Sequence, residues 1–386
     1  MYFQHPLLLT PGPTPVPLHI QTEMNLPMVG HRSSDFEAIA KEAFEALKHV
    51  FGSHQDVMIL SSSGTSALEA SMVNLLEPDD HFVVIVSGAF GNRFKQIAET
   101  YYTNVHIFDV PWGEAFDTKQ VITFIEQLNA PIKAVFTQYC ETSTAVLHPV
   151  AELGVALKTL DNEIYFVVDG VSCVGAVDVN MERDHIDILV SGSQKAMALP
   201  AGISFVACNQ RALEQINAST TPKFYLDLAK HYKSLLESST PYTPNISAFR
   251  GVIAYRRYID AIGFDNVIQH HYQIRDAVRA ALKALNFELL VNDTYASPTV
   301  TAFIPKDEAE LQKIKKELKT QFNITIAGGQ GKLKGRILRV GHMGDVSPFT
   351  LLSFIAALEI LLTQHRNTSF IGQGTKVFTE VLKDVI

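Results

Sequence analysis

The chain has 386 residues, 47% of them hydrophobic and 19% charged, and its formal net charge is −8 at pH 7. This length suits two domains, and this composition predicts a sizeable packed core. Acidic and basic residues are interspersed, without the basic stripe that phosphate backbones require. We therefore expect no nucleic-acid partner.

The cysteines and the terminal segments of the chain indicate in which cellular compartment we expect the protein. Cys140, Cys173 and Cys208 are widely spaced, so they indicate neither a disulfide framework nor a metal site, and they favour the cytoplasm. The first ten residues lack the features of a signal peptide. The apolar segment at 349–362 contains polar residues, so we expect it to be too short and too polar to span a membrane.

The N-terminal segment is rich in proline, with five prolines between residues 6 and 17, which predicts an extended arm. Apolar residues at helical spacing predict a helix over 34–51. A strand at 57–60 then leads through small polar residues into a helix at 67–76.

Alternating strands and helices follow. Several of the strands are almost entirely apolar, as in strands covered on both faces. The pattern predicts an α/β fold with a mostly parallel sheet, in which ligands bind at the carboxyl ends of the strands. The expected strands are 82–86, 105–110, 134–137, 164–168, 186–190 and 203–207.

The C-terminal third predicts a smaller α+β domain, joined to the first by a continuous helix. We expect a helical segment at 255–285 and a final helix from Pro348, capped by Asp345 or Ser347. The other expected elements are strands at 299–304, 324–326 and 337–340 and a helix at 309–322. The predicted division is an arm at 1–20, a large domain at 21–255 and a small domain at 256–386.

Two loop segments after apolar strands have the chemistry of a ligand site. Ser63, Gly64 and Thr65 begin a helix, where backbone N–H groups and the helix dipole favour an anion, although small polar residues are also ordinary helix caps. Asp169 follows the strand at 164–168. Its carboxylate would keep a pyridine nitrogen protonated, or it would simply form a turn.

Two further segments add cationic groups. Lys195 is flanked by small and apolar residues, and desolvation would lower its pKa in a way that suits Schiff-base chemistry, whereas most lysines lie on the surface. Arg336 and Arg339 point to opposite faces of a strand, so one of them can reach a cleft and bind a carboxylate through two hydrogen bonds. An ordinary surface ion pair is the alternative.

Six short segments together resemble the class V aminotransferases, and most closely the alanine–glyoxylate and serine–pyruvate aminotransferases. The resemblance extends from about residue 8 to about residue 345. It implies a pyridoxal phosphate enzyme of fold type I, acting as a homodimer with the cofactor near the interface. The segments are residues 9–13, 63–70, 88–93, 141–144, 168–169 and 192–195.

The resemblance also implies residue roles. Lys195 would form the Schiff base and move the proton during catalysis, Asp169 would pair with the pyridine nitrogen, and Arg339 would bind the substrate carboxylate near the Gly12 backbone. The remaining cofactor contacts would be the phosphate ligands Ser63, Gly64, Thr65 and Gln194, the ring neighbours Phe90 and Val171, Thr142 near the ring hydroxyl, and Tyr242 and Thr243 reaching the partner subunit's phosphate.

The sequence departs from these relatives at two places. Ala145 stands where they usually have glycine, and the spacing around Tyr242 and Thr243 differs. His31 and Arg32 resemble a feature of the relatives, with a structural or a substrate-entrance role left open.

The predicted function is a ping-pong aminotransferase that moves an amino group from alanine or serine to glyoxylate or pyruvate. The alternatives are a pyridoxal phosphate lyase, or an aminotransferase for a phosphorylated, phosphonate or ureido substrate. A desulfurase is disfavoured because no cysteine follows Cys208. A non-catalytic phosphate-binding protein is a further alternative, and a nicotinamide dehydrogenase is disfavoured because no G-x-G-x-x-G follows the first strand.

Overall fold

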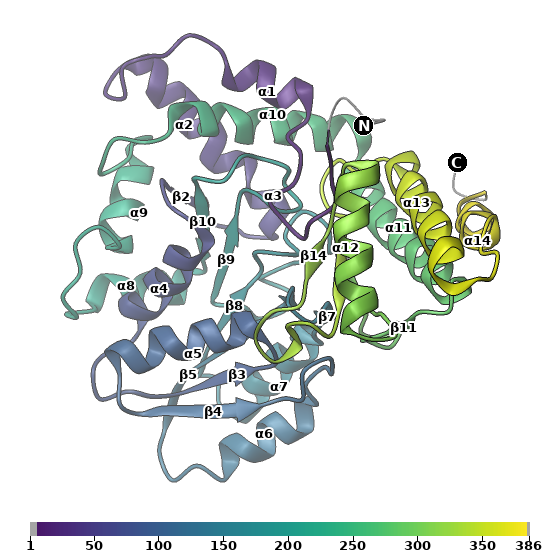
Figure 1. Cartoon of the computed structure of the whole chain (residues 1–386). Coiled ribbons are helices and arrows are strands. Elements are labelled where there is room, and N and C mark those ends of the chain that lie inside the picture. The colour runs from purple at the N-terminus through teal and green to yellow at the C-terminus, as the bar shows by residue number, and fades with distance from the viewer. Residues whose placement is uncertain (1–5, 384–386) are drawn as a thin grey trace.

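The computed structural model describes residues 6–383. Most of these residues form two units of unequal size, each a β-sheet packed against helices (Figure 1). The strands are β1 Leu7–Leu8, β2 Met58–Leu60, β3 His81–Val86, β4 Val105–Asp109, β5 Ile132–Gln138, β6 Cys140–Glu141, β7 Val146–Leu147, β8 Tyr165–Asp169, β9 Ile188–Gly192, β10 Ser204–Cys208, β11 Glu288–Leu289, β12 Val300–Ile304, β13 Ile324–Thr325, β14 Ala327–Gly328 and β15 Leu338–Gly341.

The helices cover both sheets and connect their strands. They are α1 Leu18–Met24, α2 Ser34–Ala46, α3 Lys48–Phe51, α4 Gly64–Leu75, α5 Ala89–Tyr101, α6 Thr118–Glu126, α7 Val150–Leu160, α8 Gln210–Ala218, α9 Leu228–Leu236, α10 Ile246–Ile262, α11 Phe264–Ala284, α12 Glu308–Phe322, α13 Pro348–Arg366 and α14 Gln373–Leu382, with a 3₁₀ turn at Gly331–Leu333.

The larger sheet has seven strands in the order β2-β10-β9-β8-β5-β3-β4. The strands from β9 to β4 run parallel, while β10 is antiparallel to both of its neighbours. Every residue of β8, β9 and β10 is buried, as expected for strands with helices on both faces. This confirms the predicted α/β fold with a mostly parallel sheet, and it brings the carboxyl ends of β5, β8 and β9 to one edge.

The smaller sheet, β11-β12-β15-β14, is antiparallel and packs with helices of the C-terminal third around a second core. The first core extends along the chain to Ile259 and Val267, and the second, apart from Leu9 of the N-terminal arm, begins on α11 at Ile274. The predicted boundary at residue 255 falls just before this transition, and the division into domains stays a prediction.

The N-terminal arm is mostly extended, with two differences from the expectation. Leu7–Leu8 forms β1, which pairs in parallel with β13, and Leu9 packs in the second core. The helix α1 begins at Leu18, so the last residues assigned to the arm are helical. Residues 1–5 of the predicted arm lie outside the described part of the chain.

The prediction of a continuous helix between the domains is wrong. Gly263 separates α10 from α11. Its φ of +91° and ψ of 124° lie outside the helical region, and residues with a side chain rarely adopt this conformation. The C-terminus differs as well, because α13 is not the last helix: it ends at Arg366, its C-cap Asn367 has a left-handed conformation, and α14 follows. Of the two candidate caps for α13, Ser347 accepts the hydrogen bond, from the Phe349 N–H.

The expectation that the C-terminal apolar segment is too short to span a membrane also needs correction. α13 has 19 residues and is long and apolar enough by length and composition alone. However, the helix buries Leu351, Phe354 and Leu358 in the second core, and its Glu359 is buried against α14. Core helices of this kind pass the same test of length and composition.

Candidate active site

The carboxyl ends of β8 and β9 and the N-terminus of α4 enclose a cavity of about 200 Å³. Nine of the residues predicted from the sequence line it together, although they come from distant parts of the chain. They are Ser63, Gly64, Thr65, Phe90, Thr142, Asp169, Val171, Gln194 and Lys195. Four lining residues were not predicted, namely Leu68, Arg93, Cys140 and Ser172.

Lys195 is a buried lysine in this cavity, with 7% of its surface exposed. Its Nζ donates a hydrogen bond to the Pro11 carbonyl of the N-terminal arm. Burial, followed by the positive charge of Arg339, lowers the Lys195 pKa to about 8. A larger fraction of this amine is therefore neutral near pH 7 than of an exposed lysine, and the interpretation of Lys195 as a surface-loop residue is wrong.

Asp169 is the last residue of β8 and is also buried. Its Oδ1 accepts a hydrogen bond of 2.9 Å from the Val171 N–H, so it also makes the turn contact that the sequence allowed. Burial raises the Asp169 pKa to about 7 against the opposing effect of that hydrogen bond. A cationic group in the cavity would stabilise the carboxylate form.

The N-terminus of α4 has the form of an anion site. Ser63 occupies the N-cap position, but its side chain makes no capping hydrogen bond, which leaves the N–H groups of Gly64 and Thr65 available to a ligand, while the Ser66 N–H donates to the Ser63 carbonyl. A Cβ on Gly64 would lie 2.9 Å from Val171 Cγ2, so glycine is needed for the close packing of these two cavity walls. The helix begins at Gly64, three residues before the predicted start.

Phe90 and Arg93 come from the first turn of α5 and lie on the same helix face. The Arg93 guanidinium carbon is 4.8 Å from the centroid of the Phe90 ring, and Nη1 donates to Thr65 Oγ1 at 3.3 Å. The Lys195 Nζ is 5.9 Å from the same centroid. The i, i+3 spacing of Phe90 and Arg93 in the sequence was the signal that would have placed the arginine here.

Arg339 and Gly12 approach Lys195 from the side of the smaller sheet, although neither is among the cavity-lining residues. Arg339 is buried on β15 and donates to the Gly328 carbonyl at 2.8 and 3.0 Å and to the Thr142 carbonyl at 2.9 Å. A surface ion pair is thus excluded for Arg339. Its pKa is lowered to about 10 by burial. Gly12 has φ +83°, and a Cβ there would lie 2.8 Å from Lys195 Nζ.

Arg336 lies before β15 and is exposed, which confirms that the two arginines have opposite environments. Ala145 has φ 66°, in the left-handed region. This conformation accounts for the glycine that the resembling enzymes usually have there, since glycine adopts it without steric cost.

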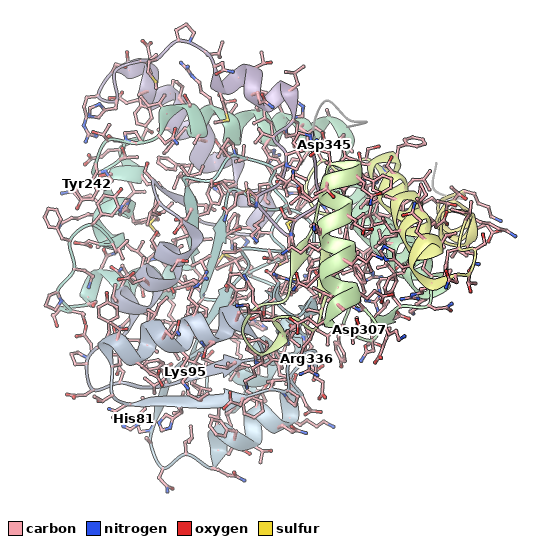
Figure 2. All side chains as sticks on the ribbon, viewed as in Figure 1. His81, Lys95, Tyr242, Asp307, Arg336 and Asp345 are labelled. Carbon is pink, nitrogen blue, oxygen red and sulfur yellow. The ribbon has the colours of Figure 1, made fainter. Side chains whose placement is uncertain are left out.

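Tyr242 and Thr243 are two further predicted residues that do not line the cavity of their own chain. Tyr242 lies at the edge of the molecule (Figure 2), where its ring stacks on Tyr225 at 4.9 Å and its hydroxyl donates to the Phe224 carbonyl at 2.8 Å. Arg32 supports the same loop through hydrogen bonds to Ser239 Oγ at 2.9 Å and to the Thr240 carbonyl at 2.6 Å.

A parallel α/β sheet with a buried lysine and a buried aspartate at its carboxyl edge defines the class of a pyridoxal phosphate transferase. Residues 19–338 match the family model described as aminotransferase class-V. The chain belongs to the class V aminotransferase family, and it is a transaminase of this pyridoxal phosphate-dependent group.

Three known proteins illustrate the relationship. A Synechococcus protein named the small subunit of a soluble hydrogenase is 35% identical over 380 residues, with 97% of this chain and 98% of that protein covered. Serine–glyoxylate aminotransferase of Hyphomicrobium methylovorum is 31% identical, with 97% and 94% covered. The crystal structure of ureidoglycine–glyoxylate aminotransferase from Bacillus subtilis has a TM-score of 0.90 at 27% identity, with 99% of each chain covered.

The residues of the cavity fit the cofactor. An uncapped helix N-terminus suits its phosphate, the buried Asp169 carboxylate suits a protonated ring nitrogen, and the Lys195 amine suits its aldehyde. The side chains of Phe90 and Val171 both line the space between these groups and supply apolar contact for a ring.

Proposed function

We propose that this protein transfers the amino group of alanine or serine to glyoxylate or pyruvate in a ping-pong reaction. The observation that carries the proposal is the arrangement around Lys195. A buried amine of lowered pKa faces a cavity that contains Asp169, and the buried Arg339 guanidinium is close enough to influence that pKa. A nucleophilic amine, a carboxylate for the ring nitrogen and a cation for a carboxylate are what transamination requires.

Bound pyridoxal phosphate supplies an aldehyde that bonds to amino groups and a ring that withdraws electrons from the substrate Cα. The protein provides the proton transfers and the alignment. Lys195, as a neutral amine, would accept the proton from the substrate Cα and donate it again in the second proton transfer of the half-reaction. Asp169 keeps the pyridine nitrogen protonated by its negative charge.

Arg339 and the Gly12 backbone orient the substrate by its carboxylate. The guanidinium is buried, and its present partners are carbonyl groups that satisfy only part of its five donors. Two parallel hydrogen bonds to a carboxylate would fix the substrate orientation and place Cα within reach of the Lys195 Nζ.

The phosphate contacts are assigned to Ser63, Gly64, Thr65 and Gln194, with Thr142 near the ring hydroxyl. We assign the loop with Tyr242 and Thr243 to the phosphate of the second subunit in a homodimer, since it does not line the cavity of its own chain. The free, buried state of all three cysteines among the described residues supports a cytoplasmic enzyme.

The names of two related proteins bear on the substrates. Serine–glyoxylate and ureidoglycine–glyoxylate aminotransferases share glyoxylate in their names and differ in the amino donor. A cavity of about 200 Å³ that must also accept the cofactor ring suits small substrates. These observations favour glyoxylate as the acceptor, and they support serine or alanine as the donor, with a ureido compound as the competing donor.

Single-substrate half-reactions test the proposal. The protein is loaded with pyridoxal phosphate, and one amino acid at a time is added without a keto acid while the visible absorbance is followed. Alanine or serine is expected to bleach the cofactor band with release of pyruvate or hydroxypyruvate, and glyoxylate is expected to restore the band with formation of glycine. Bleaching by a ureido donor alone, or release of carbon dioxide or an aldehyde, would overturn the proposal.

A further inference from the structure

Glu141, the last residue of β6, has a side chain that is fully buried beside the cavity yet has no role in the scheme above. Its Oε2 accepts hydrogen bonds from the Phe90 N–H at 3.0 Å and the Gly91 N–H at 2.9 Å. Its Oε1 accepts from the N–H and the hydroxyl of Ser143, at 3.0 and 2.6 Å. Four donors converge on the two oxygens, which is the full set that a carboxylate accepts.

These contacts form the N-terminal cap of α5. The helix begins after Gly88, which has no side chain to offer, so the N–H groups of its first turn need partners from elsewhere. Glu141 accepts two of them, and Ser143 Oγ accepts a third from Ala89 at 2.8 Å. A Cβ on Gly88 would lie 2.5 Å from Ser143 Oγ, so the fit is tight. The cap therefore fixes the backbone of Phe90 itself.

The same tripeptide also contacts the substrate-binding arginine. The carbonyl of Thr142, between Glu141 and Ser143, accepts the hydrogen bond from Arg339 Nη1. Burial raises the pKa of Glu141, but the four donors on its two oxygens favour the carboxylate, and that negative charge stabilises the charged form of Arg339. Among the described residues no carboxylate lies within ion-pair distance of Arg339, so Glu141 acts on the guanidinium without occupying its donors.

We propose that Glu141 is a positioning residue that holds Phe90 against the cofactor ring and Arg339 in the orientation that receives the substrate carboxylate. The inference deepens the proposed function and rests on its assignments of Phe90 and Arg339. Glu141 touches neither the substrate nor the reacting atoms, and it acts through the α5 cap and the Thr142 carbonyl.

The chain contains a matched control for Glu141. Glu359 is also buried, and its carboxylate caps α14, another helix whose N-cap residue is glycine. It accepts from the Gly372 N–H at 2.9 Å and from the Thr375 N–H at 2.7 Å. Glu141→Gln and Glu359→Gln therefore remove the same charge from the same kind of cap, one beside the cavity and one in the distant C-terminal helices.

The two variants are compared as cofactor-loaded proteins by three readouts: visible-region circular dichroism per bound cofactor, the cofactor dissociation constant, and the separate values of KM and kcat. In Glu141→Gln an amide NH₂ replaces one oxygen and faces two donors. We expect weaker circular dichroism and an increase of about tenfold or more in both the dissociation constant and KM. Glu359→Gln is expected to lower the melting temperature and leave all three readouts unchanged.

Equal melting-temperature losses in both variants, with unchanged circular dichroism, dissociation constant and KM in Glu141→Gln, would reduce Glu141 to a structural role and overturn the inference. If Glu141→Gln does not fold, Ser143→Ala takes its place, because it removes only the hydroxyl shared by Glu141 and the Ala89 N–H. Its expected changes lie in the same direction and are smaller, and their absence overturns the inference equally. Failure of the proposed function is distinguishable, since the wild-type protein would then show no donor-dependent bleaching.

Discussion

The lowered pKa of Lys195 makes a quantitative prediction for the cofactor-free protein. Burial and Arg339 bring this pKa from 10.5 to about 8, a difference equivalent to about 3 kcal/mol between the two protonation states. At pH 7 about one amine in ten is then neutral, against roughly one in three thousand for an ordinary lysine. Because only the neutral amine is a nucleophile, capture of pyridoxal phosphate at pH 7 should be faster than for an exposed lysine by up to about 300-fold, the ratio of the two neutral fractions.

The assay is a stopped-flow measurement of cofactor absorbance after mixing the cofactor-free protein with pyridoxal phosphate between pH 6 and 10. The second-order rate constant is expected to rise with pH and to level off above a midpoint near 8. Lys195→Ala is the control, and it should fold normally and show no specific phase.

A variant at Arg339 separates the effect of burial on the Lys195 pKa from the effect of the neighbouring positive charge. Arg339→Gln removes the repulsive charge, so the pKa of Lys195 should rise and the midpoint should move toward higher pH, although burial keeps it below 10.5. A wild-type midpoint near 10, or a midpoint that falls in Arg339→Gln, would refute the reasoning from burial and charge.

Three further substitutions have expected outcomes. Because the folded-state pKa of Asp169 is raised from 3.8 to about 7, this group lowers the free energy of unfolding progressively as the pH rises from about 4 to about 7, and the full cost remains above pH 7. Asp169→Asn should therefore stabilise the cofactor-free protein by up to about 4 kcal/mol at pH 8 and by nothing near pH 3, as measured by urea unfolding. Gly12→Ala places a Cβ at φ +83° against the Lys195 side chain, so the absorbance of the lysine-bound cofactor should be lost and stability should fall by about 1–3 kcal/mol. Arg93→Gln should raise the cofactor dissociation constant about tenfold in equilibrium dialysis, and an unchanged constant would contradict a role for its contacts with Phe90 and Thr65.

The layout of the large sheet could be predicted because its signals are local. Apolar runs of four or five residues, as in β8 and β3, mark strands buried on both faces, and a polar residue directly after such a run is placed at the carboxyl edge. Asp169 is the clearest example, since it follows four buried apolar residues of its own strand. The extra turn at the start of α4 was missed because serine, glycine and threonine have low helix propensity, which tertiary packing overrides here.

The remaining features depend on contacts between distant segments. The cap of α5 joins residues about fifty positions apart, so nothing near Phe90 in the sequence indicates that Glu141 will satisfy its N–H group. The break at Gly263 is similar, since a glycine within a helical pattern is compatible with either a continuous or an interrupted helix. Likewise, no local pattern predicts that Leu7–Leu8 pairs with β13.

The pairing of β1 explains how two separate cores maintain a single active site. The N-terminal arm joins the smaller sheet through β1 and through a hydrogen bond of 2.8 Å from the Gly341 N–H to the Leu9 carbonyl. A few residues later, Thr14 donates from its N–H to the Gln194 carbonyl at 3.2 Å and from its hydroxyl to the Lys195 carbonyl at 3.1 Å. Arg339 lies on the strand that the arm contacts, and Lys195 lies on the loop that the arm contacts. A rigid, proline-rich segment between the two sets of bonds therefore helps to fix the separation of the Lys195 amine and the Arg339 guanidinium.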